Sequence, residues 1–480
     1  MTKYFLNVLL LLLFLQPTIF AQSKKERIAT IMQTYHQYNM FDGAVLVAEN
    51  GKLVYKGAFG LANREWNIAN TTDTKFMIGS VSKPITSILT LIEAQKGLID
   101  LDKTISDYIP EFSSKNGKRI TIRELMSHTS GMPNYEIIPD FFPRISRQYF
   151  TREDYMKIYM DSSLLFEPGT NYNYSSWGYF TLGYILERVT GKTYSQLMKE
   201  EIFDKIGMNS SGSYYHTQIV TKRATGYDYN LDGYKSSDFR DQSNTMGAGD
   251  IYSTVEDLFK LHLAISNNTL LNKELTKEMF TRGIRPWQYG YGWFNQMWKY
   301  SSTDSVFCNY HLGMTEGFLS FLLRIPETNS FVVILCNSSP TDFFGITNNL
   351  VRVLYNKPVK LKKPVHKALA STISHKGIDA AIKQYDELKK DTANYYLEWW
   401  NIDQLGHQLY DMKRYKEALL LFEKNAQEFP QRDIALVSLG QTYEILGRKE
   451  DAIVYYKKAI AANPGNEEAK NRLKNLEKDK

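Results

Sequence analysis

The sequence contains few cysteines and histidines and, beyond its first residues, no long apolar run. Two cysteines, Cys308 and Cys336, in 480 residues are too few for a disulfide scaffold; they could pair with each other or remain small buried side chains. The eight histidines form neither an H-E-x-x-H motif nor a cluster with cysteine, so no metal and no cofactor is expected. Past residue 21, no segment reaches the ~18 apolar residues of a membrane span, and none is expected in the mature chain.

An excess of charge of one sign is also missing. Lysine and arginine total 58 and aspartate and glutamate 52, which gives a formal net charge of +6. This charge is small and dispersed, unlike that of a nucleic-acid-binding surface. The densest basic run holds Lys360, Lys362 and Lys363 and is interpreted as a solvated linker. Nucleic acid is therefore not an expected partner.

The first 21 residues have the pattern of a secretory signal peptide. Lys3 supplies a positive charge, an apolar run of 11 residues follows it, and Ala21 offers a cleavage position before the polar stretch "QSKKE". The run is too short for a spanning helix. The sequence thus predicts export, to the periplasm or the medium.

The part from 22 to 357 has strand signals at both ends and helix signals between them. Apolar and polar residues alternate around Asn50-Gly51 in the stretch 43–60, which predicts a β-hairpin. A helix is expected from about Ser80 to Gly97, and the stretch 317–338 is typical of two strands joined by a turn. The predicted class is α/β (α+β), with a sheet that collects the N- and C-terminal strands.

The part from 366 to 480, after a linker at 358–365, is rich in helix formers and repeats with a period of 34 residues. Four positions recur at this spacing: Gly406 and Gly440, Ala418 and Ala452, Phe422 and Tyr456, Pro430 and Pro464. The pattern resembles the tetratricopeptide repeat. Two repeats cannot bury a stable core, so the segment 366–400 is expected to add helices. The region is either a structural cap or a concave surface for a protein partner.

Ser80 and Lys83 are the residues whose spacing first indicates catalysis. A serine needs a group that takes its proton before it becomes a good nucleophile. Residues i and i+3 of a helix lie on the same face, so the amine of Lys83 is expected beside the hydroxyl of Ser80. Ser80 is the only serine in the chain with a lysine three residues later. A helix N-terminus also presents free N–H groups that can serve an oxyanion hole.

Six blocks of sequence extend this observation beyond one motif. They occur in this order: "IGSVSK", "GLIDLDKTISDYIPEF", "ITIRELMSHTSGMP", "FEPGTNYNYSSWGYFTLGYILERVTG", "MGAGDIYSTVEDL" and "HLGMTEGFLSFLLRIPETNSFVVILCNSS". Together they closely resemble the serine β-lactamase and penicillin-binding-protein superfamily, on its class C β-lactamase and D-Ala-D-Ala carboxypeptidase branch. The resemblance covers roughly residues 25–355 and implies an antiparallel sheet flanked by helices.

The resemblance also implies catalytic roles. Ser80 matches the acylated nucleophile, and Lys83 matches its partner lysine. Tyr174 in "YSS" matches the tyrosine of the Tyr-x-Asn motif. It would share proton transfer with Lys83, either as a phenol or as a phenolate held by the charge of the lysine.

A third motif is implied near the C-terminal strands. His311 and Gly313 in "HLG" match the family motif Lys-Thr-Gly or His-x-Gly, whose strand flanks the substrate. The backbone N–H of Met314 would join that of Ser80 in the oxyanion hole. No metal takes part in this chemistry.

Two positions depart from the family pattern. The asparagine of the second motif is Ser176 here, whose hydroxyl is shorter and cannot offer an amide donor and acceptor. The lysine of the third motif is His311, so a titrating group replaces a permanent cation. Both changes favour an esterase, amidase or peptidase over an efficient β-lactamase. His128 in "SHTSG" is expected to hold a loop by hydrogen bonds, and the stretch 247–250, "GAGD", is expected to form a tight turn near the site.

Two functional hypotheses follow. The first is an exported serine hydrolase that forms an acyl-enzyme at Ser80 with amide or ester substrates, of the D-amino-acid peptide, ester or β-lactam type. The second is a weakly active or inactive binding module whose helical repeats contact a protein. The substitution at Ser176 permits the second hypothesis, whereas Ser80, Lys83, Tyr174 and His311 favour the first.

Overall fold

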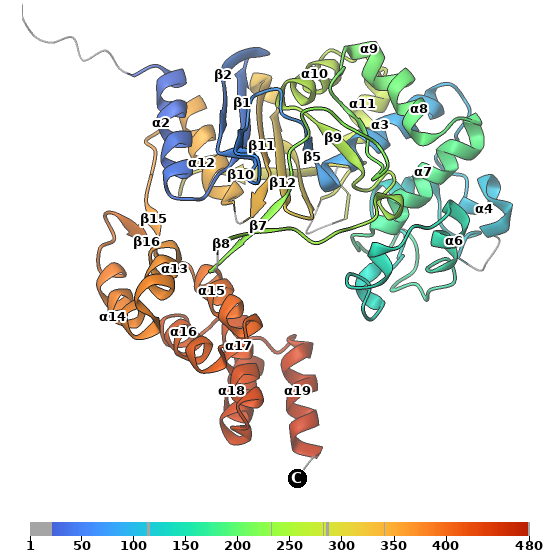
Figure 1. Cartoon of the computed structure of the whole chain (residues 1–480). Helices are drawn as coiled ribbons and strands as arrows, with labels where there is room; N and C mark the ends of the chain where they lie inside the picture. The colour runs from blue at the N-terminus through green and yellow to red at the C-terminus, as the bar shows by residue number, and fades with distance from the viewer. Residues whose placement is uncertain are drawn as a thin grey trace, which may run out of the picture.

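The computed structural model describes residues 22–478, except 113–115, 232, 282, 285–287 and 340. The signal peptide predicted for 1–21 lies outside the described residues. Within them, no helix is long and apolar enough to cross a membrane. An α/β region, blue to yellow in Figure 1, is followed by a helical region in orange and red.

The α/β region is built on one antiparallel sheet of six strands. Their bounds are β1 Gly43–Glu49, β2 Lys52–Phe59, β10 Phe294–Lys299, β11 Ser305–Thr315, β12 Phe318–Ile325 and β13 Ser330–Cys336. They lie in the order β10-β11-β12-β13-β1-β2, so the last strands of the region pair with the first. The predicted sheet composition is confirmed, and with it the α/β (α+β) class.

The two predicted turns connect the strands as expected. Asn50 and Gly51 both have positive φ, 52° and 70°, which is the backbone that a two-residue turn between β1 and β2 requires. Asn329, with φ 42°, ends the turn between β12 and β13. Asparagine and glycine tolerate this left-handed conformation better than other residues do.

Both faces of the sheet are covered, because side chains alternate between them along each strand. Ala44, Leu46 and Ala48 of β1 belong to one apolar core, and Val45 and Val47 belong to the other. The second core packs against α2, Lys24–Gln37, and α12, Phe343–Leu354. The first core packs against α3, Ser82–Gln95, α7, Ser176–Thr190, and α10, Val255–Ser266. Figure 1 shows these helices on the two sides of the sheet.

Shorter elements complete the α/β region. The helices are α4 Ile105–Tyr108, α5 Ile122–Met126, α6 Arg152–Lys157, α8 Tyr194–Met198, α9 Asp204–Ile206 and α11 Lys273–Met279. The strands are β3 Leu61–Asn63, β4 Ile68–Ala69, β5 Phe76–Met77, β6 Gly212–Ser213, β7 Tyr227–Asn230, β8 Gly233–Ser236, β9 Ile251–Ser253 and β14 Ser338–Ser339.

The first helix of the helical region, α13, begins at Val365, next to the predicted boundary at 366, and the short strand β15 precedes it. Its elements are β15 Lys363–Pro364, α13 Val365–Lys376, α14 Ile378–Leu388, β16 Tyr395–Tyr396, α15 Trp399–Asp411, α16 Tyr415–Glu428, α17 Asp433–Ile445, α18 Lys449–Ala462 and α19 Glu467–Lys478. A Cβ on Gly406 would lie 2.5 Å from the ring of Phe422, and one on Gly440 would lie 2.6 Å from that of Tyr456. The positions that repeat in sequence therefore lie where α15 packs closely on α16 and where α17 packs closely on α18.

The two regions are in direct contact. Ser374 Oγ on α13 donates to the backbone oxygen of Leu231, and Tyr396 OH donates to Asp342 Oδ2 at the start of α12. Both cysteines are buried free thiols, on β11 and β13, with β12 between the two strands.

Candidate active site

Ser80 lies in a tight 3-10 turn, Gly79–Val81, that leads directly into α3. Gly79 has φ +49°, and a Cβ there would lie 2.7 Å from the backbone oxygen of Met314 and 2.8 Å from its nitrogen. Only glycine allows this approach without strain. The predicted helix start is confirmed, and the turn holds the nucleophile against the end of β11.

Lys83 is completely buried beside Ser80. Its Nζ lies 3.0 Å from Ser80 Oγ and 2.9 Å from the backbone oxygen of Ala248. No carboxylate of the described residues forms an ion pair with it. Burial, supported by the positive charge of Arg240, holds the pKa of Lys83 well below its ordinary value of 10.5. A neutral amine keeps a lone pair, so Nζ can donate to Ala248 and accept the proton of Ser80.

Tyr174 lies two residues before α7, with its ring centroid 4.8 Å from Lys83 Nζ. The surrounding protein raises the pKa of this phenol well above its ordinary value, and a hydrogen bond with Ser80 opposes that shift only in part. Burial therefore favours the phenol and works against the phenolate form. The lowered pKa of Lys83 favours its neutral amine, so the hydroxyl, the amine and the phenol can pass one proton among them.

His311 is buried and does not act as a charge near neutral pH. Its Nδ1 lies 2.6 Å from the backbone oxygen of Leu312, which can only accept, so Nδ1 carries the proton. Nε2 then accepts from Tyr289 OH at 2.9 Å. Burial, and after it the charge that Lys83 carries when it is protonated, lowers the pKa of His311 to about 3. The expectation of a titrating group at this position is corrected, because the titration lies far below neutral pH.

The residues 311–315 extend β11 beyond its neighbour β10, whose last pair joins Phe294 to Tyr310. The free edge of this stretch faces the nucleophile turn. A Cβ on Gly313 would lie 2.0 Å from the backbone oxygen of Ile78 and 3.0 Å from the backbone nitrogen of Ser80. Since a Cβ on Gly79 would lie 2.8 Å from the backbone nitrogen of Met314, the backbone of Met314 lies beside that of Ser80, as an oxyanion hole requires.

Ser176 is the first residue of α7, and its backbone nitrogen donates to Asn134 Oδ1 at 2.9 Å. The amide nitrogen of Asn134 donates in turn to Glu136 Oε1. An asparagine is therefore present next to the second motif, although it comes from a loop 42 residues earlier. Asn134 directly follows the block "ITIRELMSHTSGMP", and that adjacency is the only signal that could have identified it.

His128 holds the chain segment that carries Tyr174. Its backbone oxygen accepts from Asn173 N at 2.9 Å, and its Nδ1 accepts from Ser175 N at 3.2 Å. Its ring lies 4.2 Å from that of Tyr174. These contacts agree with the predicted loop-holding role.

Asp250 closes the tight turn that places Ala248 against Lys83. Its Oδ1 accepts from Gly247 N at 2.9 Å, and its other oxygen accepts from Ser213 Oγ. Burial raises the pKa of Asp250 to about 6 from its ordinary 3.8. The turn at 247–250 agrees with the tight turn expected near the site. Tyr289 and Asn134 were not identified from the sequence, because no motif marks them. Among the described residues, no three His, Cys, Asp or Glu side chains come together as metal ligands.

Replacing Asp250 with asparagine is expected to remove a pH dependence of stability between about pH 4 and pH 6. The folded protein binds the proton of Asp250 more tightly than the unfolded chain does, so this group's contribution decreases as pH rises through that window. A shift of this size corresponds to about 2 to 3 kcal/mol. Urea unfolding of both forms from pH 4 to pH 7 measures the difference. The exposed Asp238→Asn variant is the control, and parallel curves for Asp250→Asn and the parent would contradict the prediction.

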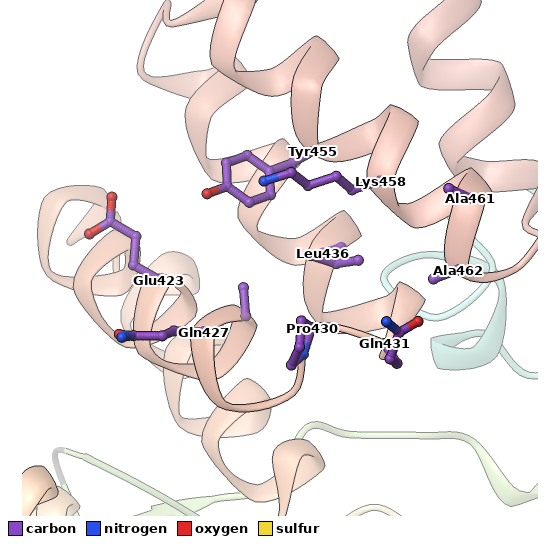
Figure 2. A pocket seen from close by; sticks show the side chains of 10 residues that line it. Glu423, Gln427, Pro430, Gln431, Leu436, Tyr455, Lys458, Ala461 and Ala462 are labelled. Atoms are coloured by element: carbon purple, nitrogen blue, oxygen red, sulfur yellow. The ribbon is translucent and has the colours of Figure 1, made fainter.

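The helical region contains a separate hollow, shown in Figure 2. Its walls come from α16 and α18, and Leu436 of α17 forms part of its floor. The other lining residues are Glu423, Ala426, Gln427, Pro430, Gln431, Tyr455, Lys458, Ala461 and Ala462. It is made by the repeats alone and is distinct from the site around Ser80.

Comparisons with known proteins match both regions. The family described as Beta-lactamase matches residues 25–357, and the tetratricopeptide repeat matches residues 434–466. Penicillin-binding protein 4* of Bacillus subtilis is 26% identical over 384 residues, which cover 75% of this chain and 82% of that protein. A teichoic acid D-alanine hydrolase of Staphylococcus aureus is 26% identical over 335 residues, 69% of this chain and 77% of that one. The D-amino acid amidase of Ochrobactrum anthropi has a similar fold, with a TM-score of 0.58, 24% identity, and coverage of 69% and 98%.

Proposed function

The chain belongs to the beta-lactamase family of serine hydrolases, and from that premise we propose that it is an exported enzyme that forms an acyl-enzyme at Ser80. Its substrates are amides or esters, of the D-amino-acid peptide, ester or β-lactam type. The proposed chain organisation is a signal peptide at 1–21, the hydrolase domain at 22–357, a linker at 358–365 and the repeats at 366–480. Export places the mature enzyme in the periplasm or the medium.

One observation carries this proposal: the buried Lys83 lies 3.0 Å from Ser80 Oγ, with its pKa lowered by burial. In acylation, Lys83 takes the hydroxyl proton of Ser80 while Oγ bonds to the carbonyl carbon of the substrate. The bond to the leaving amine or alcohol then breaks, and the proton passes to that group, with Tyr174 as a relay. Water attacks the acyl carbon in the second half. The water gives one proton through Lys83 back to Ser80 Oγ. The bond between Oγ and the acyl carbon breaks, and the acid is released.

The developing negative charge on the carbonyl oxygen is assigned to two backbone N–H groups, those of Ser80 and Met314. The contacts of Gly79 with Met314 and of Gly313 with Ser80 N support this assignment. Such preorganised donors stabilise the tetrahedral intermediate more than the substrate.

The substrate preference is proposed from the second and third motifs. Ser176 replaces an amide side chain, and His311 is neutral because its pKa is about 3, so neither provides the polar groups of an efficient β-lactamase. The relatives support D-amino acyl chemistry, since one is named a teichoic acid D-alanine hydrolase and a structural neighbour a D-amino acid amidase. Hydrolysis of D-amino acyl esters or amides is therefore proposed ahead of β-lactam hydrolysis.

Replacing Ser80 with alanine is expected to abolish covalent labelling by a fluorophosphonate or a penicillin, with a loss of at least about 10³-fold in rate. The labelled hydroxyl is absent, and the rest of the site remains folded. Intact mass after incubation with each reagent measures the label. The exposed Ser163→Ala variant should label like the parent, and labelling of Ser80→Ala at the parent rate would refute the acyl-enzyme.

Intact mass also separates acylation from turnover. The parent is incubated with a panel of D-amino acyl esters, D-peptides and β-lactams, and the acylated fraction is followed with time. A transient acyl mass with release of the acid indicates hydrolysis. A persistent mass with β-lactams and a transient one with D-amino acyl esters is the expected result.

A second function, protein binding by the repeats, is favoured by the hollow between α16 and α18. The occupant is proposed to be a protein or peptide of the cell envelope. The test uses the full chain with Tyr455→Ala and Lys458→Glu together, because both side chains line the hollow. A partner that crosslinks to the parent and not to this variant, with equal ester hydrolysis by both, supports it; a partner retained by both argues against this surface.

A further inference from the structure

A cavity that the proposed mechanism does not use lies between the sheet and the helices α10 and α11. Its volume is about 350 Å³, within the range of small-molecule sites. This Arg324 cavity is lined by residues that include Ser266, Thr276, Asn309 and Arg324. Asn309 lies four residues before Gly313 on β11, or roughly 13 Å along the strand. The Arg324 cavity is therefore separate from the oxyanion hole.

Arg324 brings a buried positive charge into this cavity. The residue is only 4% exposed. Its Nε donates to His262 Nδ1 and its Nη2 to Ser266 Oγ, both at 3.1 Å, whereas Nη1 is buried without a hydrogen-bond partner. In the part of the chain that the structure describes, no carboxylate forms an ion pair with it. Burial lowers the pKa of Arg324 to about 9, so the guanidinium is still a cation near pH 7.

The groups packed around the guanidinium do not neutralise its charge. Burial, and after it the charge of Arg324, lowers the pKa of His262 to about 3, so the imidazole is neutral. The guanidinium lies 5.0 Å from the ring centroid of Phe280 and 5.8 Å from that of Trp293. Apolar rings exclude water and strengthen any ion pair formed beside them. A buried cation with unused N–H groups is costly until an anion approaches it.

Asn309 adds an unpaired acceptor beside the cation. It is opposite Arg324 in the pairing of β11 with β12, so the two side chains lie on the same face of the sheet. Its Nδ2 donates to Asn295 Oδ1 at 2.9 Å, and its own Oδ1 is buried without a partner. A ligand that carries a hydroxyl next to its negative charge can satisfy both Arg324 and Asn309.

We propose that the Arg324 cavity binds a small 2-hydroxycarboxylate, with its carboxylate on Arg324 Nη1 and its hydroxyl donating to Asn309 Oδ1. Charge-assisted hydrogen bonds from a guanidinium to a carboxylate are among the stronger ones in proteins. A 2-hydroxy acid has a net charge of −1, which matches the single unpaired cation. An amino acid would bring a second cation beside Arg324. This inference does not depend on the acyl-enzyme at Ser80.

The test titrates the full chain with sodium lactate at constant ionic strength and follows the NMR line width of the lactate methyl group. The expected Kd is about 0.1 to 1 mM. Propionate lacks the hydroxyl and should bind at least about fivefold more weakly, and the neutral methyl lactate at least about tenfold more weakly. Equal affinity for lactate and propionate would refute the contact with Asn309. Equal affinity for lactate and its methyl ester would refute the contact with Arg324.

Variants locate the bound lactate. Arg324→Met should raise the Kd at least about tenfold. Thr276→Phe fills the cavity from α11 and leaves Arg324 in place, so it should cause the same loss even if Arg324→Met is poorly folded. Lys277→Phe, at an exposed position of the same helix, is the matched control and should bind like the parent. Ser80→Ala should also bind like the parent. Absence of binding by the parent, or a parent-like Kd in both Arg324→Met and Thr276→Phe, overturns the inference.

Discussion

Replacing Lys83 with methionine is expected to slow acylation of Ser80 by about 10³- to 10⁴-fold. Lys83 Nζ is the only amine within hydrogen-bond distance of Ser80 Oγ among the described residues, and methionine keeps the length of the side chain without a base. The measurement is the second-order rate of acylation by a D-amino acyl thioester, followed by intact mass. Lys52→Met, at an exposed position on β2, is the matched control.

The pH dependence of the same rate identifies the base. Only the neutral form of Lys83 can accept a proton, and its pKa is lowered, so the rate should increase with pH and level off well below pH 10.5. His311 cannot cause this increase of the rate with pH, since its pKa is about 3. The increase of the rate with pH should be absent in Lys83→Met. If Lys83→Met keeps both the rate and its increase with pH, another group is the base.

The lysine also affects stability. The folded protein holds Lys83 neutral where the unfolded chain protonates it, so stability should increase as pH rises from the folded pKa to that of a free lysine, about 10.4. Lys83→Met lacks this pH-dependent contribution to the free energy of unfolding. It is therefore expected to be as stable as the parent at high pH and more stable than the parent at low pH.

Replacing Gly313 with alanine is expected to disrupt both the fold and the oxyanion hole. The new Cβ would lie 2.0 Å from the backbone oxygen of Ile78 and 2.4 Å from Ser320 Oγ. Backbone cannot yield as a flexible side chain does, so the strand must move away from the nucleophile turn. Overpacking of this kind costs about 1 to 3 kcal/mol, and loss of one oxyanion donor costs about 10²- to 10³-fold in kcat.

The measurements are the free energy of unfolding in urea and the kcat for a D-amino acyl ester. Gly178→Ala is the matched control, because its Cβ would only touch Leu125 at an ordinary 3.5 Å inside α7. It should leave kcat unchanged and stabilise the helix slightly. If Gly313→Ala retains the parent kcat, the backbone of Met314 is not part of the oxyanion hole.

The features that depend on short range and on periodicity can be predicted from the sequence alone. Ser80 and Lys83 are three residues apart at a helix start, and a helix turn brings such residues together whatever else the chain does. The hairpin at Asn50-Gly51 follows from the backbone that those two residues allow. The 34-residue repeat predicted which helices cross most closely, since Gly440 packs on Tyr456 and Gly406 on Phe422.

The pKa shifts and the hydrogen-bond partners of these groups depend on the tertiary structure. The pKa of Lys83 is lowered because its side chain is buried, and Ala248, which accepts from it, is 165 residues away. His311 accepts from Tyr289, a pairing that no motif marks. Asn134 reaches the site from a loop without a repeating pattern. The physical reason is that a pKa and a hydrogen bond depend on atoms within a few ångströms in space, and chain spacing determines those neighbours only within about one helical turn or one hairpin.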